Sequence, residues 1–216
     1  MFTQNICLND LSEDSWQKLA GLKVLIVGDG ACVGGVVANL AMLKVGEIGL
    51  LNSIDRDYVA EKVLKSSVDT VVRGYDAELW SEDTATVIVN YDIVIDCLTD
   101  YESKFVLNRL LAGIEKPFIY SSMSKYNGQV TLIKAGTTAC LECLFPQGNI
   151  EVFDVDDDFE LLAGAISAIQ VRVLLGYVLR RDEDLQNTLI SYNSDSLSLK
   201  KITLVKNPEC KVCSGH

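Results

Sequence analysis

The sequence lacks the features that mark membrane and secreted proteins. It has no uncharged apolar run of about 18 residues, which is the length that a membrane-spanning helix needs. Its first residues, Met1 to Asn5, do not combine a basic region with an apolar core, as a signal peptide does. We therefore expect a cytoplasmic protein with no membrane partner.

Clusters of lysine and arginine are also missing. Lys and Arg number 19 and Asp and Glu number 30, which gives a formal net charge of -11. Acidic residues gather at Asp154 to Asp158, a segment that we interpret as a solvated loop. Nucleic-acid binding needs clustered basic side chains, so we expect no nucleic-acid partner. No repeat, low-complexity segment or linker interrupts the chain, which predicts a single domain over residues 1–216.

The most informative stretch joins an apolar run to a glycine loop. Val24 to Val27 is typical of a buried parallel strand, and the apolar segment Val36 to Val45 is typical of a helix. The loop between them contains Gly28 and Gly30. Such a turn lets backbone N–H groups and a helix dipole face a phosphate. Gly28 and Gly30 are therefore candidate nucleotide-binding residues.

The rest of the chain alternates between strand and helix patterns and then changes character. After a helix or arm in residues 1–20, with Ser12 as candidate N-cap, residues 21–125 form a nucleotide-fold half. Residues 126–216 form an antiparallel half with a long helix and cysteine pairs. The pattern predicts an α/β, Rossmann-like, mostly parallel sheet with helices on both faces and an antiparallel C-terminal extension. The expected strands are Leu22–Val27, Glu47–Asn52, Val68–Arg73, Asp92–Cys97, Pro117–Ser121, Gly128–Ile133, Leu189–Tyr192 and Leu197–Val205; the expected helices are Tyr58–Lys65, Tyr101–Ala112 and Phe159–Arg180; and Thr84–Val89 is either a strand or the end of a helix.

Four of the seven cysteines form two Cys-x-x-Cys pairs, Cys140/Cys143 and Cys210/Cys213. Two such pairs give four thiolates that can surround one ion tetrahedrally, which in a cytosolic protein indicates zinc. A site with four protein ligands has no open position, so this zinc is structural. The alternative is a redox dithiol or a set of metal-free thiols.

The motifs, taken in order, resemble those of the MoeB/ThiF/HesA superfamily, the relatives of ubiquitin-activating enzymes. The resemblance rests on the glycine loop, Asp96–Tyr101, Gly128–Val130, Cys140–Pro146 and Asn207–Cys213, and it covers nearly the whole chain. It implies a dimer that binds ATP and magnesium beside the glycine loop. Such an enzyme adenylates the C-terminal glycine of a small ubiquitin-like or sulfur-carrier protein. The resemblance assigns the nucleotide to Gly28, Gly30 and Asn52, and magnesium to Asp100.

The sequence departs from the family pattern where the chemistry needs it most. Val33 replaces a loop glycine, where we expect it to crowd a ligand, and Asn52 replaces an aspartate. Gln4 and Val59 stand where the family has an arginine and a lysine for the phosphates. Counting back from Lys104 places Thr99, rather than Asp100, at the magnesium position, and Asp100 can also serve as a helix N-cap.

These departures favour a degenerate member that acts as a partner or scaffold subunit, as a homodimer or with an active paralogue. The alternative is an active ATP-dependent adenylyltransferase, so the sequence leaves the enzymatic status open. Gln147 to Leu162 contains no cysteine, so no thioester transfer is expected. An NAD-dependent oxidoreductase fits less well, because the cysteine pairs have no place in it.

Overall fold

The computed structural model describes residues 11–52, 69–79, 81–146 and 159–214. The predicted helix Tyr58–Lys65 lies outside these residues, as do Gln4 and Val59.

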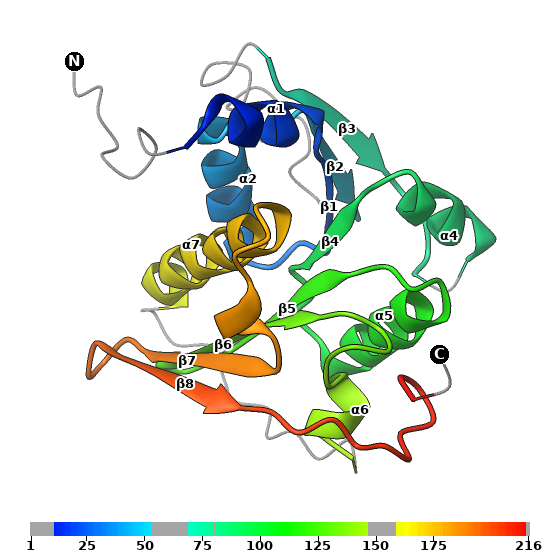
Figure 1. The fold of residues 1–216 in the computed structure, drawn as a ribbon, viewed down its shortest axis with the longest axis vertical. Helices are drawn as coiled ribbons and strands as arrows, with labels where there is room; N and C mark the ends of the chain where they lie inside the picture. The colour runs from blue at the N-terminus through cyan, green and yellow to red at the C-terminus, as the bar shows by residue number, and fades with distance from the viewer. Residues whose placement is uncertain (1–10, 53–68, 80, 147–158, 215–216) are drawn as a thin grey trace.

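The described chain forms an 8-stranded sheet in the order β3-β2-β1-β4-β5-β6-β7-β8 (Figure 1). The strands are β1 Lys23–Val27, β2 Glu47–Leu51, β3 Val71–Tyr75, β4 Ile93–Asp96, β5 Phe118–Ser124, β6 Asn127–Ile133, β7 Thr188–Asn193 and β8 Ser198–Thr203. The helices are α1 Glu13–Gly21, α2 Cys32–Met42, α4 Glu82–Val89, α5 Tyr101–Gly113, α6 Leu141–Leu144, α7 Phe159–Val178 and the 3-10 turn η1 Glu183–Leu185.

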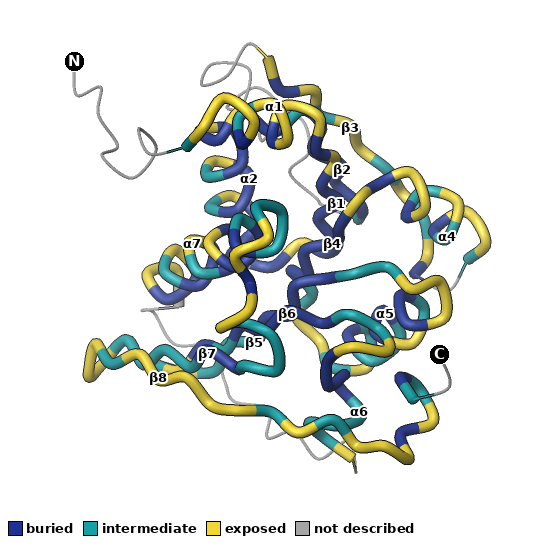
Figure 2. The backbone as a smooth tube through the Cα atoms, in the orientation of Figure 1, coloured by how far each residue is buried: buried dark blue, intermediate teal, exposed yellow. Residues whose placement is uncertain are grey.

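The strands from β3 to β5 pair in parallel, and β5 to β8 continue the sheet in antiparallel pairs. Strand β1 is apolar on both faces because helices cover both sides of the sheet. Val24 and Ile26 join a core with α2 and α7, whereas Leu25 and Val27 join a core with α5. Figure 2 shows this buried centre and the exposed edge strand β8. The predicted fold class is confirmed.

The structure decides one open assignment and moves several boundaries, including the end of β5 from Ser121 to Ser124. Thr84–Val89 is the end of helix α4, one of the two predicted alternatives, because Ser81 caps α4 by accepting a hydrogen bond from the Thr84 N–H, and Thr84 and Ile88 are buried one turn apart. Strand β3 begins at Val71, later than expected. Helix α2 begins at Cys32, before the apolar run, because the turn at Gly30 is short and its carbonyl already accepts from the Val33 N–H.

Helix α7 is long and apolar enough, over Glu160–Val178, to cross a membrane, and it is the one such helix in the described part of the chain. Half of this segment is buried inside the fold, and α7 packs on α2, β5 and β6. Close packing is possible because Gly35 of α2 meets Ser167 of α7, where a β-carbon would overlap the Ser167 hydroxyl group. These contacts are typical of the core helix of a globular domain.

Candidate nucleotide edge and metal centre

The glycine loop packs tightly against the segment that follows β4. Gly28 has a φ of +106°, and a β-carbon there would lie 2.7 Å from the backbone of Cys97 and Leu98. A β-carbon on Gly30 would lie 2.6 Å from the Cys97 carbonyl oxygen, which also accepts a 2.9 Å hydrogen bond from the Gly30 N–H. Contacts within the chain therefore require both glycines, whether or not a nucleotide binds.

The first turn of α2 follows this loop. Ala31 caps the helix without a side-chain hydrogen bond, and the turn carries no acidic residue. Val33 is buried in the core, so its side chain does not crowd the outer surface of the loop as the sequence suggested. Gly34 has open space around it. The N-terminus of α2 brings the positive end of the helix dipole to this edge, as an anion site would need.

We expect Gly28→Ala to destabilise the protein by about 2 kcal/mol or more, because the new methyl group meets backbone atoms and the φ is unfavourable. Gly34→Ala is the matched control. It lies in α2 with no atom near the added methyl group, so it is expected to raise stability by about 0.5–1 kcal/mol. Urea denaturation of both variants measures the difference, and equal effects would contradict the packing described above.

Asn52 directly follows β2 and forms hydrogen bonds with the segment after β3. It has a left-handed φ of 58°, and its amide nitrogen donates to the Ala77 carbonyl oxygen over 2.7 Å. Its amide oxygen accepts from the Ala77 N–H over 3.1 Å. Both groups that could contact a ribose hydroxyl are thus engaged by the segment after β3. The structure gives Asn52 a positioning role that its place in the sequence did not suggest.

A buried ion pair lies beneath the end of β4. The Lys104 ammonium contacts both Asp96 carboxylate oxygens, at 3.0 and 2.9 Å, and also donates to the Ser121 carbonyl. Asp96 and Lys104 are only 0% and 3% exposed. Gln170 of α7 donates to the Asp96 carbonyl and to the Ser121 hydroxyl. Burial raises the pKa of Asp96, whereas the Lys104 charge and the Leu98 N–H oppose that rise.

This network was not identified as a site from the sequence. Its signal was the charged residue at the end of an otherwise apolar strand, followed eight positions later by Lys104 in a helix. No sequence signal pointed to Ser121 or Gln170.

Asp100 is the N-cap of α5. Its carboxylate accepts a 2.8 Å hydrogen bond from the Ser103 N–H, and its side chain is exposed. Thr99 lies closer to the glycine loop, since its methyl carbon would be 3.4 Å from a β-carbon on Gly30. The ion pair of Lys104 fixes the start of α5. Thr99 therefore contacts the glycine loop, and Asp100 caps α5.

The four predicted metal ligands come together beside α5. Their sulfur atoms all lie within 4.8 Å of one another. The sulfurs of Cys140 and Cys210 are 3.6 Å apart, those of Cys143 and Cys213 are 3.5 Å apart, and those of Cys140 and Cys143 are 3.9 Å apart. Four sulfurs at tetrahedral zinc–thiolate bond lengths stand about 3.8 Å from one another. The donor set and its spacing therefore fit a single zinc ion.

The surroundings of the cysteines also suit a metal. The Asn207 N–H points at the Cys143 sulfur, at 3.4 Å. Burial raises the pKa of Cys140 above the usual thiol range, and burial with the neighbouring Cys143 thiol raises that of Cys213 to about 11. For Cys210, burial acts upward but the backbone N–H groups of Cys213 and Val212 outweigh it, and the pKa falls to about 7. Four thiolates this close need a divalent cation to balance their charge.

Side chains of α5 hold the residues around the first cysteine pair. Arg109 of α5 contacts a carboxylate oxygen of Glu142 at 2.7 Å, and Asn108 donates to the other oxygen. The Asn108 amide oxygen also accepts from the Leu141 N–H. These contacts hold the first cysteine pair on α6 against the body of the domain.

Comparison with known proteins identifies the family to which this chain is similar. The model of the ThiF family matches residues 56–212. Adenylyltransferase and sulfurtransferase MOCS3 of Culex quinquefasciatus is 25% identical over all of this chain, which spans 55% of that relative. Sulfur carrier protein adenylyltransferase of Thermus thermophilus is 22% identical, again over all of this chain, which covers 90% of it.

Solved structures agree on the fold. E. coli MccB superposes with a TM-score of 0.78 at 17% sequence identity, covering 93% of this chain and 67% of MccB. At this identity the likeness shows the fold alone, whereas the family match extends over most of the sequence. The chain belongs to the ThiF family.

Proposed function

We propose that this protein is a partner or scaffold subunit in the activation of a ubiquitin-like or sulfur-carrier protein, and that it does not itself transfer adenylate. The family match and the relatives named as a sulfur carrier protein adenylyltransferase and a SAMP-activating enzyme E1 support the pathway class. The scarcity of positive charge among the described residues at the carboxyl edge of the sheet supports the loss of adenylate transfer. On this proposal the protein works in the cytosol, as a homodimer or beside an active paralogue.

The observation that carries this proposal is the lack of positive charge in the described residues that directly follow β1, β2 and β4. The described residues that directly follow β1, β2 and β4 are 28–31, 52 and 97–100, and they include no lysine or arginine. Lys104, the nearest cation along α5, is buried and neutralised by Asp96. Asp29 on the glycine loop adds an exposed carboxylate. Transfer at the α-phosphate of ATP requires charges that balance the triphosphate, and each such group commonly contributes about 3 kcal/mol.

The alternative is an active adenylyltransferase, and one observation favours it. Asp29 and Asp100 are both exposed, in the segments that follow β1 and β4. Carboxylate oxygens are the ligands that magnesium prefers, so these two side chains offer a route to a metal-bound nucleotide. The proposal and its alternative make opposite predictions for ATP.

We expect the purified protein, with a candidate carrier protein, to show no ATP–pyrophosphate exchange above the buffer rate, because the transition state lacks stabilising charge. An active family member assayed in parallel serves as the positive control. Magnesium-ATP is also expected to leave the melting temperature unchanged, since tight binding to the folded state must raise it. Exchange that depends on the carrier, and that Asp29→Asn or Asp100→Asn abolishes, would establish the alternative.

We also propose that the cysteine cluster holds one structural zinc ion. The tetrahedral spacing of the sulfurs and the hydrogen bond to Cys143 support it. With four protein ligands the ion would have no position for substrate, so its role would be to hold the chain after β8 against α6.

A further inference from the structure

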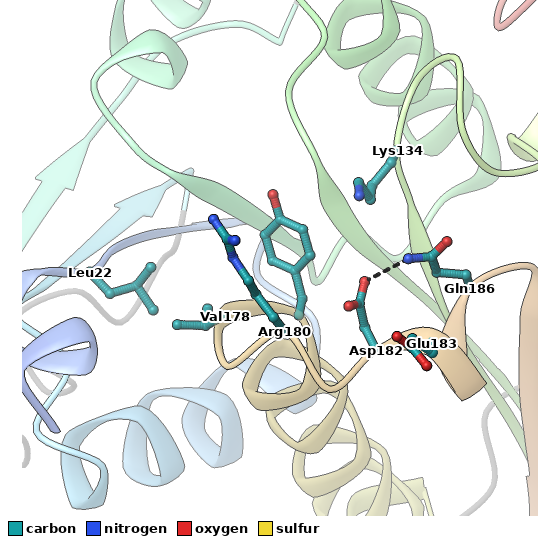
Figure 3. Close-up of a pocket in the computed structure, with 8 residues that line it drawn as sticks. Leu22, Lys134, Val178, Arg180, Asp182, Glu183 and Gln186 are labelled. Carbon is teal, nitrogen blue, oxygen red and sulfur yellow. Dashed lines mark hydrogen bonds between the residues drawn. The ribbon is translucent and has the colours of Figure 1, made fainter. Parts of the chain in front are cut away.

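A pocket of about 550 Å³ lies at the edge of the sheet opposite the glycine loop (Figure 3). Two of its lining residues come from this edge of the sheet: Leu22 precedes β1, and Lys134 follows β6. Tyr177 and Val178 line it from the end of α7. Its volume falls in the range of small-molecule sites, which is about 300–1,000 Å³. Neither the fold nor the ThiF family assignment accounts for it.

The pocket presents both signs of charge beside apolar groups. Lys134 and Arg180 approach it from different elements, and within the described chain neither forms an ion pair. The Lys134 ammonium lies 5.4 Å from the centre of the Tyr177 ring. Asp182, which is only 8% exposed, also lines the pocket, and its carboxylate accepts a hydrogen bond from the Gln186 amide.

The Asp182 carboxylate is close enough to Tyr177 to affect the pKa of its hydroxyl group. Burial first, and then the charges of Asp182 and Asp92, raise the pKa of Tyr177. A buried carboxylate with one neutral partner has further capacity to accept hydrogen bonds. A ligand with only a negative or only a positive group would leave one side of the pocket without a partner, and would forgo the hydrogen bonds that a zwitterion makes there.

We propose that this pocket binds a free α-amino acid with an apolar or aromatic side chain. Its carboxylate pairs with Arg180 and Lys134, and its ammonium group pairs with Asp182. Its side chain lies against Leu22, Val178 and the Tyr177 ring. The site lies at the edge of the sheet opposite the glycine loop, and the proposal is independent of whether the protein activates a carrier.

Arg180 makes a sharp test possible. It has a left-handed φ of 53° at the end of α7, where glycine is usually favoured. Lys44 has the same φ of 53° at the end of α2 and does not line this pocket. Arg180→Gly and Lys44→Gly therefore both relieve backbone strain, but only the first removes a cation from the pocket.

The experiment is calorimetric titration of the full chain with L-phenylalanine and L-leucine. We expect saturable binding of one molecule per chain. N-acetyl-L-phenylalanine, which lacks the ammonium group, and L-phenylalaninamide, which lacks the carboxylate, should each bind about tenfold more weakly or worse. L-aspartate and L-lysine, whose side chains are charged, should also bind more weakly than L-leucine.

The variants assign the two ends of the ligand. Arg180→Gly should weaken L-phenylalanine binding by about tenfold while keeping or raising the melting temperature, and Lys44→Gly should leave binding unchanged. Asp182→Asn should remove the preference for L-phenylalanine over its N-acetyl derivative. Asp184→Asn, on the same turn but outside the pocket, should preserve that preference.

Two results would overturn the proposal. One is the absence of saturable binding with both amino acids at millimolar concentration. The other is binding that Arg180→Gly and Asp182→Asn leave unaltered in folded protein.

Discussion

Cys213→Ser is expected to lower the free energy of unfolding by about 4 kcal/mol or more, and to reduce bound zinc from about one ion per chain to a substoichiometric amount. Cys213 is fully buried, and its sulfur lies 3.5 Å from that of Cys143. On the proposal of a structural zinc ion, losing one of the four thiolates would open the site to water and leave three charged ligands around the ion. Urea denaturation and metal analysis of the purified variant measure the two effects.

Cys32→Ser provides the control for this prediction. Cys32 is also a buried free cysteine, but it lies in the core at the start of α2, outside the four-sulfur cluster. Its substitution should leave the zinc content unchanged and cost less stability. Removing zinc from the native protein with a chelator should reproduce the Cys213→Ser effect. A metal-free protein as stable as the metal-bound one would refute the structural role.

Lys104→Met is expected to destabilise the fold by about 3–5 kcal/mol, because it leaves the Asp96 carboxylate buried without its counter-ion. The same substitution at Lys18 is the matched control. Lys18 pairs with Asp14 at 2.6 Å on the surface of α1, where both side chains are at least half exposed. An exposed pair contributes at most about 1 kcal/mol, so Lys18→Met should have little effect.

The pH dependence of Lys104→Met follows from the pKa of Asp96. Burial raises this pKa in the folded state, and loss of the ammonium group removes the main opposing charge. A carboxyl group whose folded pKa is raised favours folding below its unfolded pKa, and this advantage disappears as pH rises through the folded pKa. The variant should therefore be less destabilised near pH 5 than near pH 8.

A second substitution separates charge from packing. Asp96→Asn in the Lys104→Met background should recover part of the lost stability, because the amide oxygen can still accept from the Leu98 N–H without a buried charge. A double variant as unstable as Lys104→Met at every pH would show that the loss comes from packing alone.

Much of the fold was predictable because burial leaves a direct mark on the sequence. Strands covered on both faces must be apolar throughout, and Val24–Val27 and Ile93–Ile95 are. The cysteine cluster was predictable for a related reason, since Cys-x-x-Cys places two sulfurs on one short turn. The Ser12 cap of α1 followed from local chemistry alone and is present.

The site at the carboxyl edge was less predictable, because its geometry depends on contacts between distant segments. The sequence gives no sign that the amide of Asn52 pairs with the backbone of Ala77, 25 residues away. It also does not show that Val33 turns into the core, which depends on where α2 begins. The buried partner of Asp96 is set by the position of α5 under the sheet.

The cysteine cluster also sets an order of events during translation. The first pair precedes α7, and the second follows β8, so Cys140 and Cys210 are 70 positions apart in the chain. A nascent chain that has exposed only the first pair can offer an ion two thiolates, and closing so long a loop carries an entropic cost that the remaining contacts must offset. Coordination by all four cysteines then requires that α7, β7 and β8 have already been synthesised and have left the ribosome. Binding of the proposed zinc ion by all four cysteines would therefore require that the antiparallel half of the sheet has been synthesised.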